Sequence, residues 1–394
     1  MADEVSVLIV DDSALMRNII SKMVEATPGL VVVDKAMNGK FALQKIPRVD
    51  PDVIVLDLEM PEMNGIEFLK ERKKRGLKIP VIILSSIARR GAEITMEALS
   101  LGASDFIQKP SGSISEDLHV VKDTLTNMLL GYGGRYRRLQ GKKVLTPSEY
   151  SAKPAAGTQA ASPVAGAPSS TWSSTSSIKA ALGSILPSTG PSKPLAQLRK
   201  PGKTEVIAIG ISTGGPDALR LVFAQLDADL QTPILVVQHM PPGFTSEFAK
   251  SLDRICPLEV KEAEEGDIIK PGRILIAQGN KHLEVEKKSL AAIARLTDAP
   301  LTSGHRPSAD VLFASVAKAY SNHALGVIMT GMGRDGAEQL GSIYREGGLT
   351  IGQDEASAVV YGMPRVAHEL GHVMEQVSLT NMARRICDLA KAPR

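Results

Sequence analysis

Three polar residues in the C-terminal half of the chain could together carry out hydrolysis. Ser212, His239 and Asp335 each follow an apolar run, and Ser212 and Asp335 stand among glycines. The carboxyl ends of parallel strands meet at one edge of a sheet. Side chains gathered there can form a relay in which the histidine takes the serine proton and the aspartate orients the imidazole. Gly331 and Gly333 would let the backbone N–H near Met332 approach an oxyanion.

Other interpretations of Ser212 stay open on the residues alone. Gly-Ile-Ser-Thr-Gly matches the nucleophile elbow of α/β-hydrolases, but the order Ser212, His239, Asp335 differs from the order in that fold. Turns between a strand and a helix also bind phosphates, and a lone serine there is more often a helix cap. The later polar loop with His305 and Arg306 could line a substrate cleft.

A second group of polar residues lies in the N-terminal half. Asp11, Asp12, Asp57 and Lys109 all follow predicted strands, as does Ser85. Neighbouring carboxylates raise one another's pKa unless a hard cation such as Mg²⁺ is present. Lysine and serine can bind phosphoryl oxygens, so the set suits phosphoryl transfer to an aspartate. The alternative is that each acid only caps a helix.

Short apolar runs alternate with helical patterns on both sides of the middle of the chain, which predicts two doubly wound parallel sheets. The expected strands are residues 5–10, 30–33, 53–56, 81–84 and 105–107, then 206–209, 234–237, 273–277, 325–329 and 348–351. Helices are expected between them, for instance over residues 13–25 and from about Asp217.

The middle of the chain has a different composition. Ser, Ala, Pro, Gly and Thr make up 35 of residues 151–200. Such a segment buries little apolar surface, so we expect a flexible linker over residues 131–203, between domains at 1–130 and 204–394. A helically spaced apolar patch at residues 178–186 could bind a partner.

The charge is also unevenly distributed along the chain. Residues 124–204 hold eleven Lys or Arg and one acid, leaving 35 basic and 42 acidic residues elsewhere. The net charge of +3 therefore results from a basic middle segment and an acidic remainder whose charges nearly cancel.

Composition also excludes several classes of protein. Two cysteines far apart cannot form a disulfide framework and suit a reducing cytoplasm. The acidic N-terminus and the absence of 18 consecutive apolar residues favour a cytoplasmic protein without membrane insertion. The basic residues lie in the expected linker and no helix-turn-helix pattern follows, so we expect no nucleic-acid partner.

Four motifs of the N-terminal half resemble those of a response-regulator receiver domain. They are VLIVDDSALMR, VIVLDLEMPEMNGIEFL, VIILSS and GASDFIQKP. The resemblance implies a flavodoxin-like fold in which Asp57 accepts a phosphoryl group from a histidine kinase. It implies Mg²⁺ held by Asp11, Asp12, Asp57 and the carbonyl of Glu59. It implies a phosphorylation switch of Ser85, Phe106 and Lys109, although Phe106 could be an ordinary core aromatic.

The C-terminal half resembles the catalytic domain of the chemotaxis protein-glutamate methylesterases. GISTGGP, QHMPPGFT, GHRPSADVLF and TGMGRDG carry that resemblance. It implies a Rossmann-like three-layer domain that needs no cofactor, with Ser212 as nucleophile, His239 as general base and Asp335 as orienting acid. It also implies an oxyanion hole at Thr213 and the Met332 backbone.

Together these resemblances imply a phosphorylation-activated hydrolase of bacterial chemotaxis. It would demethylate glutamyl γ-methyl esters of chemoreceptors, releasing methanol, and could also deamidate glutamine. Its partners would be a chemotaxis histidine kinase and the receptors. We expect the unphosphorylated receiver to cover the Ser212 cleft. The alternative is a phosphate sink or signalling adaptor whose second domain only binds.

Overall fold

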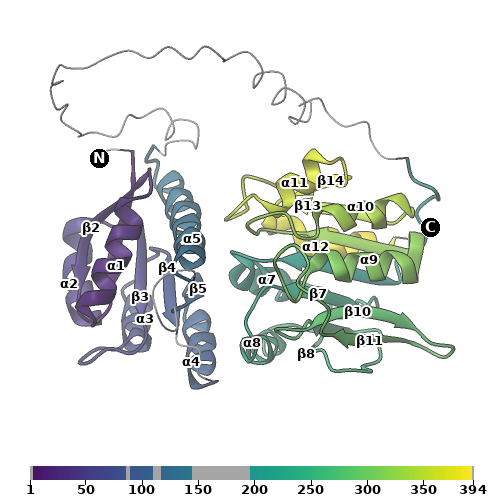
Figure 1. The fold of residues 1–394 in the computed structure, drawn as a ribbon, viewed down its shortest axis with the longest axis horizontal. Coiled ribbons are helices and arrows are strands. Elements are labelled where there is room, and N and C mark those ends of the chain that lie inside the picture. The colour runs from purple at the N-terminus through teal and green to yellow at the C-terminus, as the bar shows by residue number, and fades with distance from the viewer. Residues whose placement is uncertain (1–2, 86–88, 110–116, 144–195, 393–394) are drawn as a thin grey trace, which may run out of the picture.

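The computed structural model describes residues 3–85, 89–109, 117–143 and 196–392. These residues form two α/β domains, each built on a parallel sheet covered by helices (Figure 1). The predicted fold class is therefore confirmed. The apolar patch at residues 178–186 lies outside the described residues.

The first domain has a five-stranded parallel sheet in the order β2-β1-β3-β4-β5, the flavodoxin-like order. Its strands are β1 (Val5–Val10), β2 (Leu30–Ala36), β3 (Val53–Asp57), β4 (Val81–Ser85) and β5 (Asp105–Gln108). Its helices are α1 (Ala14–Glu25), α2 (Gly39–Val49), α3 (Gly65–Lys74), α4 (Arg89–Ser100) and α5 (Asp117–Leu139).

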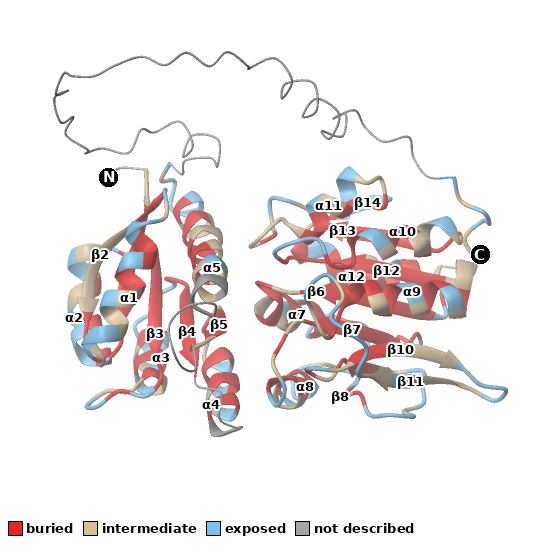
Figure 2. Cartoon of the chain, viewed as in Figure 1, coloured by how far each residue is buried: buried red, intermediate tan, exposed pale blue. Residues whose placement is uncertain are grey.

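Local sequence explains why these elements begin where they do. Strands β1, β3 and β4 are buried along their whole length because helices cover both faces of the sheet (Figure 2). The Ser13 side chain accepts a hydrogen bond from Met16 N and starts α1, and Asn64 forms a capping box with Glu67 at the start of α3. These caps fix α1 and α3 directly after the loops that carry the acidic residues.

The second domain has a seven-stranded parallel sheet in the order β14-β13-β12-β6-β7-β9-β8, with a separate antiparallel hairpin. Its strands are β6 (Val206–Ile211), β7 (Ile234–Gln238), β8 (Glu259–Glu262), β9 (Arg273–Ile276), β12 (Ala324–Ile328), β13 (Leu349–Gln353) and β14 (Glu375–Val377), and the hairpin is β10 (His282–Lys287) with β11 (Ala292–Thr297). Its helices are α7 (Gly215–Phe223), α8 (Phe244–Asp253), α9 (Ala309–Tyr320), η1 (Ser321–His323), α10 (Ala337–Arg345), α11 (Met363–Glu369) and α12 (Leu379–Lys391).

The structure departs from the sequence-based expectation in a few places. Strands β8 and β14 were not expected, because they are short edge strands with charged or polar residues and lack an apolar run. The β10–β11 hairpin was also missed, since its alternating residues do not resemble a buried parallel strand. Helix α7 begins at Gly215, slightly before the expected start. Helix α5 continues past residue 130.

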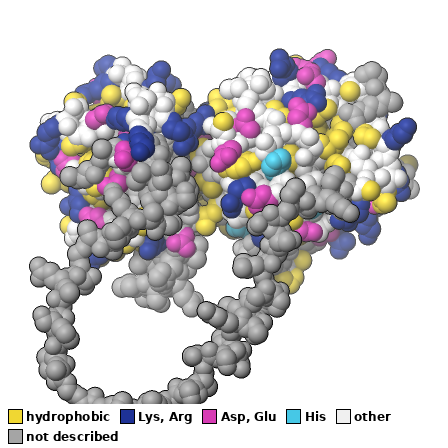
Figure 3. Space-filling view, turned by 90° about the horizontal axis from the view of Figure 1, so that it is seen from above, with side chains coloured by type: hydrophobic (Ala, Val, Ile, Leu, Met, Phe, Trp, Pro, Cys, Tyr) yellow, Lys and Arg dark blue, Asp and Glu magenta, His cyan; other side chains and the backbone are white. Residues whose placement is uncertain are grey.

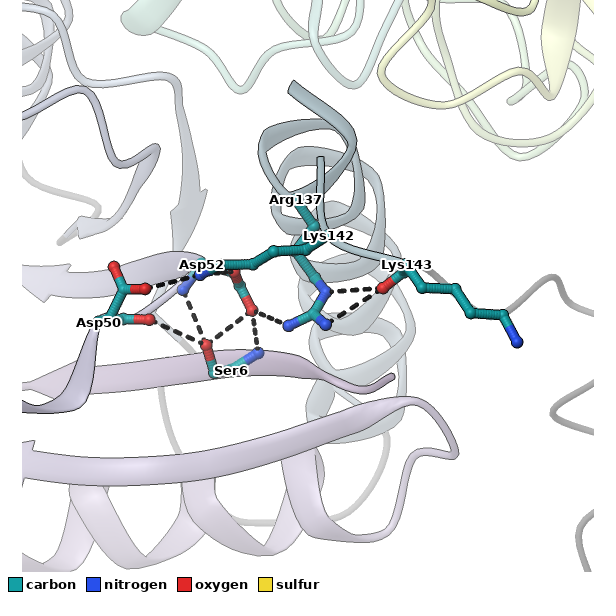
Figure 4. Close-up of polar contacts among 6 residues, drawn as sticks. All are labelled: Ser6, Asp50, Asp52, Arg137, Lys142 and Lys143. Carbon is teal, nitrogen blue, oxygen red and sulfur yellow. Dashed lines mark hydrogen bonds and ion pairs between the residues drawn. The ribbon is translucent and has the colours of Figure 1, made fainter. Parts of the chain in front are cut away.

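A buried ion pair fixes the end of α5 to the sheet of its own domain (Figure 4). Arg137 Nη1 lies 2.8 Å from Asp52 Oδ2, and both side chains are almost fully buried. The same carboxylate accepts hydrogen bonds from Ser6 N and Ser6 Oγ, and the Arg137 guanidinium also donates to Lys143 O. The turn after α5 is therefore held at the edge of the sheet where β1 and β3 begin, opposite Asp57.

The two domains pack through the α4, β5 and α5 side of the first and the α7 and α8 side of the second (Figure 1). Phe106 of β5 stacks on Phe244 at the start of α8, with ring centroids 4.9 Å apart and planes 8° from parallel. In Figure 3, basic side chains of the first domain and acidic side chains of the second lie on either side of the junction. Within the described ranges, no helix has the length and apolar character required to cross a membrane.

Candidate active site

Ser212, His239 and Asp335 come together at the carboxyl edge of the seven-stranded sheet. His239 Nδ1 lies 3.0 Å from Ser212 Oγ, and His239 Nε2 lies 2.8 Å from Asp335 Oδ2. A carboxylate facing Nε2 favours the tautomer with the proton on Nε2, which leaves the Nδ1 lone pair to accept the serine proton. The three residues thus have the geometry of a serine-activating relay.

Asp335 is held as an anion by a dense set of donors. Its carboxylate accepts hydrogen bonds from Ser308 Oγ at 2.5 Å and from the backbone N–H groups of Ala309 at 2.6 Å and Asp310 at 3.3 Å, in the first turn of α9. Burial raises the pKa of Asp335, but His239, Ser308 and the Ala309 N–H outweigh burial and lower the pKa below its ordinary value. An ionised Asp335 can stabilise an imidazolium at His239.

The loop that presents Ser212 is shaped by close backbone packing. Gly214 has a φ of +83°, and a Cβ there would lie 2.8 Å from Val359 Cβ, so only glycine fits without strain. Gln238 Nε2 donates to Ser212 O, and Thr330 Oγ1 donates to Thr213 O. These contacts fix the direction of the Ser212 side chain relative to His239.

Two backbone N–H groups beside Ser212 suit an oxyanion. Among the described residues, neither the Thr213 N–H nor the Met332 N–H has a hydrogen-bond acceptor. Both residues line the same cavity as Ser212. An ester carbonyl oxygen placed between them would meet donors at the position where negative charge develops.

The loop before α9 contributes His305 and Arg306 differently. The His305 ring stacks on the His239 ring at a centroid distance of 3.9 Å, and its pKa is lowered to about 4 by burial and by the neighbouring His239. Arg306 donates to Asn280 Oδ1 and to the carbonyls of residues 298 and 299. His305 therefore faces His239, whereas the Arg306 guanidinium holds the loop together.

The carboxylates of the first domain also gather as predicted. Single oxygens of Asp11, Asp12 and Asp57 lie within 4.8 Å of one another. Lys109 Nζ lies 2.7 Å from Asp57 Oδ2 and 3.5 Å from Asp11 Oδ2. Burial raises the pKa of Asp57, and Asp11 adds to the rise, against the lowering effect of Lys109. Glu59 and Ser85 line the hollow beside Asp57 and Lys109.

This cluster fits a hard divalent cation. Asp11 Oδ2 is buried and has no hydrogen-bond partner among the described residues, so the three carboxylates leave oxygen ligands available. Mg²⁺ prefers such ligands and keeps several waters. Of the expected switch residues, Ser85 Oγ lies 2.5 Å from Thr95 Oγ1 in the buried interior, and Phe106 touches the second domain.

One contact between the domains was not foreseen from the sequence. Gly214 N–H donates to Asp105 Oδ2 at 2.8 Å, so a receiver carboxylate caps the amino end of α7, which has no side-chain cap of its own. Burial raises the pKa of Asp105 to about 7, although the Gly214 N–H, the Phe106 N–H and the Tyr132 hydroxyl oppose the rise. The capped residue lies two positions after Ser212.

Comparison with known proteins assigns each half of the chain to a family. Residues 207–386 match the family described as CheB methylesterase, and residues 7–119 match the response regulator receiver domain. A Treponema denticola protein named protein-glutamate methylesterase/protein-glutamine glutaminase is 61% identical over 98% of both chains. This chain belongs to the CheB methylesterase family. The resemblance drawn from the motifs is confirmed.

A second relative agrees with that membership. A Treponema pallidum protein of the same name is 52% identical over 98% of this chain and 96% of its own. The crystal structure of the Thermotoga maritima CheB methylesterase catalytic domain is 34% identical, with a TM-score of 0.47, and covers 48% of this chain and 100% of that chain.

Three residues that contact the Ser212 loop or Asp335 were not predicted from the sequence: Asp105, Gln238 and Ser308. Gln238 and Ser308 carried weak signals, since one is the polar end of an apolar strand and the other directly precedes a helix. Asp105 carried none, because its partner is 109 positions away in the other domain.

Proposed function

We propose that this chain is a phosphorylation-regulated chemotaxis methylesterase that hydrolyses glutamyl γ-methyl esters of chemoreceptors and also deamidates glutamine. The assembled Ser212–His239–Asp335 relay is the observation that carries the proposal. The names of the Treponema relatives, methylesterase and glutaminase, support both activities. An adaptor that only binds would not need this relay.

The reaction follows from the geometry. Ser212 Oγ attacks the ester carbonyl while His239 Nδ1 takes its proton, and the oxyanion accepts hydrogen bonds from Thr213 N–H and Met332 N–H. His239 then gives the proton to the leaving oxygen, so methanol departs and an acyl-serine remains. Water, deprotonated by His239, releases the glutamate carboxylate. With a glutamine substrate the leaving group is ammonia.

Regulation starts at Asp57, which we propose accepts a phosphoryl group from a histidine kinase. Asp11, Asp12, Asp57 and the carbonyl of Glu59 would hold Mg²⁺, which supplies positive charge to the carboxylates and the phosphoryl oxygens when bound. Lys109 Nζ is placed to pair with a phosphoryl oxygen. Ser85 and Phe106 would then change position and loosen the docked face.

The docked receiver limits access to Ser212. Asp105, Phe106 and Met128 of the receiver share one cavity with Ser212 and His239. A helix of a chemoreceptor is about 10–12 Å wide with its side chains. We infer that such a helix does not reach Ser212 until phosphorylation displaces the receiver. We place the reaction in the cytoplasm, where free thiols such as Cys256 and Cys387 persist.

Methanol release from a methylated receptor tests the proposal. The native protein should release methanol faster with a phosphodonor, Ser212→Ala should release none, and Asp57→Ala should keep only the basal rate. An adaptor would keep its signalling output in the Ser212→Ala variant, and that result would reject the esterase assignment.

A further inference from the structure

One side chain joins the nucleophile and the general base of the proposed reaction. Gln238 is the last residue of β7 and directly precedes His239, and only 2% of it is exposed. Its Nε2 donates to Ser212 O at 3.1 Å and to His239 O at 3.2 Å. Both hydrogens of the amide are therefore bound to the main chain of the two residues that carry the chemistry.

The contact with Ser212 O sets the direction of a neighbouring N–H group. Ser212 C=O and Thr213 N–H belong to one trans peptide, so they point in opposite directions. Ser212 O accepts hydrogen bonds from Gln238 Nε2 and from Gly215 N, the latter at 2.7 Å. Because these two donors hold the carbonyl against rotation of the peptide, they also fix the direction in which Thr213 N–H points.

The second proposed oxyanion donor is held differently. Met332 N–H shares a peptide with Gly331 O, which accepts hydrogen bonds from Gly362 N at 3.1 Å and Met363 N at 2.9 Å. Two backbone N–H groups therefore orient Met332 N–H, whereas one backbone N–H and one side chain orient Thr213 N–H. Of the two donors, Thr213 is the one whose direction depends on a side chain.

The other end of the Gln238 amide is unfavourable for the fold. Gln238 Oε1 is buried and has no hydrogen-bond partner among the described residues. Rotating the amide would not help, because Oε1 would then face the carbonyls of Ser212 and His239. A Cβ at Gly215 would lie 1.8 Å from Oε1, and its three nearest atoms would all belong to Gln238. The absence of a side chain at Gly215 thus leaves room for the amide beside the first turn of α7.

We propose that Gln238 is a positioning residue for the oxyanion hole, which holds the Ser212–Thr213 peptide so that Thr213 N–H faces the acyl oxygen. This inference rests on the proposed esterase function and adds no chemical step, since Gln238 acts through main-chain carbonyls. The charge on the acyl oxygen is largest in the transition state, so a correctly directed Thr213 N–H raises kcat and leaves KM unchanged. Ester and amide substrates form the same oxyanion, and both depend on Gln238.

Gln238→Met keeps the length of the side chain but has no donor, and it tests the inference in the full-length protein with acetyl phosphate and Mg²⁺. For a methylated receptor fragment, kcat should fall about 10- to 100-fold while KM changes by less than about twofold. A boronic acid that forms a tetrahedral adduct with Ser212 mimics the oxyanion, so its Ki should rise by the factor by which kcat falls. A raised KM with native kcat, or unchanged boronate binding, would overturn the inference.

A second glutamine provides the matched control. Gln225 of α7 is exposed, and its Nε2 donates to Leu221 O within the same helix. Gln225→Met should keep the native kcat and the native Ki for the boronic acid. A fall in kcat of the same size in both variants would show that the loss does not come from the contact with Ser212 O.

Gly215→Ala disturbs the same contact without changing Gln238, and it keeps the inference testable if Gln238→Met fails to fold. The added Cβ would lie 1.8 Å from Oε1 and must push the amide away from Ser212 O. We expect kcat to fall about tenfold with KM unchanged, because a small misplacement of the hole is costly. In a Gln238→Ala background the same substitution should lower kcat by less than about twofold. Native kcat in Gly215→Ala, or fully additive losses in the double variant, would overturn the inference.

The inference and the proposed function can fail separately. If the native protein releases no methanol from the methylated receptor, or if Ser212→Ala still releases it, the esterase itself is rejected. If the native protein releases methanol and Gln238→Met keeps the native kcat and boronate affinity, the esterase stands and the inference falls.

Discussion

Asp57 and Asp335 both lie at the carboxyl edge of a parallel sheet, yet their surroundings shift their pKa values in opposite directions. Asp57 is buried beside Asp11 with Lys109 as its main partner, and its pKa is raised. Asp335 receives donors from His239, Ser308 and the amino end of α9, and its pKa is lowered. The comparison shows how hydrogen-bond donors decide the ionisation of a buried carboxylate. Burial and Asp11 disfavour the charge on Asp57, whereas the site at Asp335 is built around a permanent anion.

The largest difference between the two sites should appear when each carboxylate becomes an amide. Asp335→Asn removes the charge that stabilises the imidazolium, and kcat for methanol release should fall about 10⁴-fold. Asp57→Asn should leave the basal rate in place and abolish only the response to phosphodonor. A similar loss of basal rate in both variants would mean that Asp57 also supports the chemistry.

Removal of one hydrogen-bond donor should raise the pKa of Asp335, so that this carboxylate comes to resemble Asp57. Ser308→Ala deletes a charge-assisted hydrogen bond of about 1.5–3 kcal/mol, so kcat/KM should fall about 10- to 100-fold. Because the pKa of Asp335 then rises, activity should be lost at a higher pH when the solution is acidified. A pH profile of kcat/KM measures this shift, and Ser308→Thr, which keeps the hydroxyl, should restore most of it. An unshifted profile would assign Ser308 to packing alone.

The contact between the domains should make inhibition depend on pH. Burial raises the pKa of Asp105 to about 7, and the second domain supplies part of this burial, so a bound proton favours docking. Docking is strongest at low pH and weakens as pH rises through 7. Receptor demethylation by the unphosphorylated protein should therefore rise by up to about tenfold between pH 6 and 8, relative to the phosphorylated protein.

Other charged and titratable groups face Asp105 and set a control for that measurement. Tyr132 donates to it from α5, and Asp217 of α7 raises its pKa, while Arg135 lies close to Asp217. In Asp105→Asn the extra pH dependence should disappear, and the two forms of the protein should then show parallel profiles. If the variant keeps the dependence, Asp217 or another group is responsible.

The smallest effect is expected at the edge of the docked face. Arg135 Nη1 donates to Ser357 O over 3.4 Å, a long and partly exposed hydrogen bond. Arg135→Ala should cost at most about 0.5–1 kcal/mol of docking and raise basal receptor demethylation about twofold. A tenfold rise would show that the docked face depends on this arginine far more than its geometry implies.

Residues at strand ends could be predicted from the sequence because an apolar run fixes both the strand and the edge at which it ends. Ser212, His239 and Asp57 follow this rule, and the structure places them where their runs predict. Asp335 comes later in a loop, and its nearness to His239 could be expected only from the glycines around it. The donors to Asp335 could not be derived, since they depend on how α9 approaches from another part of the chain.

Contacts between the domains could not be predicted from the sequence. Phe106 could be predicted as a buried aromatic, but its partner Phe244 depends on the relative orientation of two separately folded sheets. The same holds for Asp105 and Gly214. No local pattern encodes such an orientation, because it depends on apolar surfaces that meet only after both domains have folded: one buried cluster runs from the receiver into the second domain, and Val359 packs against the receiver core.

The buried Asp52–Arg137 ion pair fixes the end of α5 within the receiver domain itself. It holds residues 137–143 at the edge of the receiver sheet that lies opposite Asp57, and the same helix, α5, contacts the second domain through Arg135. Every contact named between the domains lies within residues 3–143 or 196–392. We therefore propose that the receiver acts as an inhibitor carried in the same chain as its target. Supplied as a separate polypeptide, it should still bind the catalytic domain, and dilution alone should then do what phosphorylation does in the intact protein.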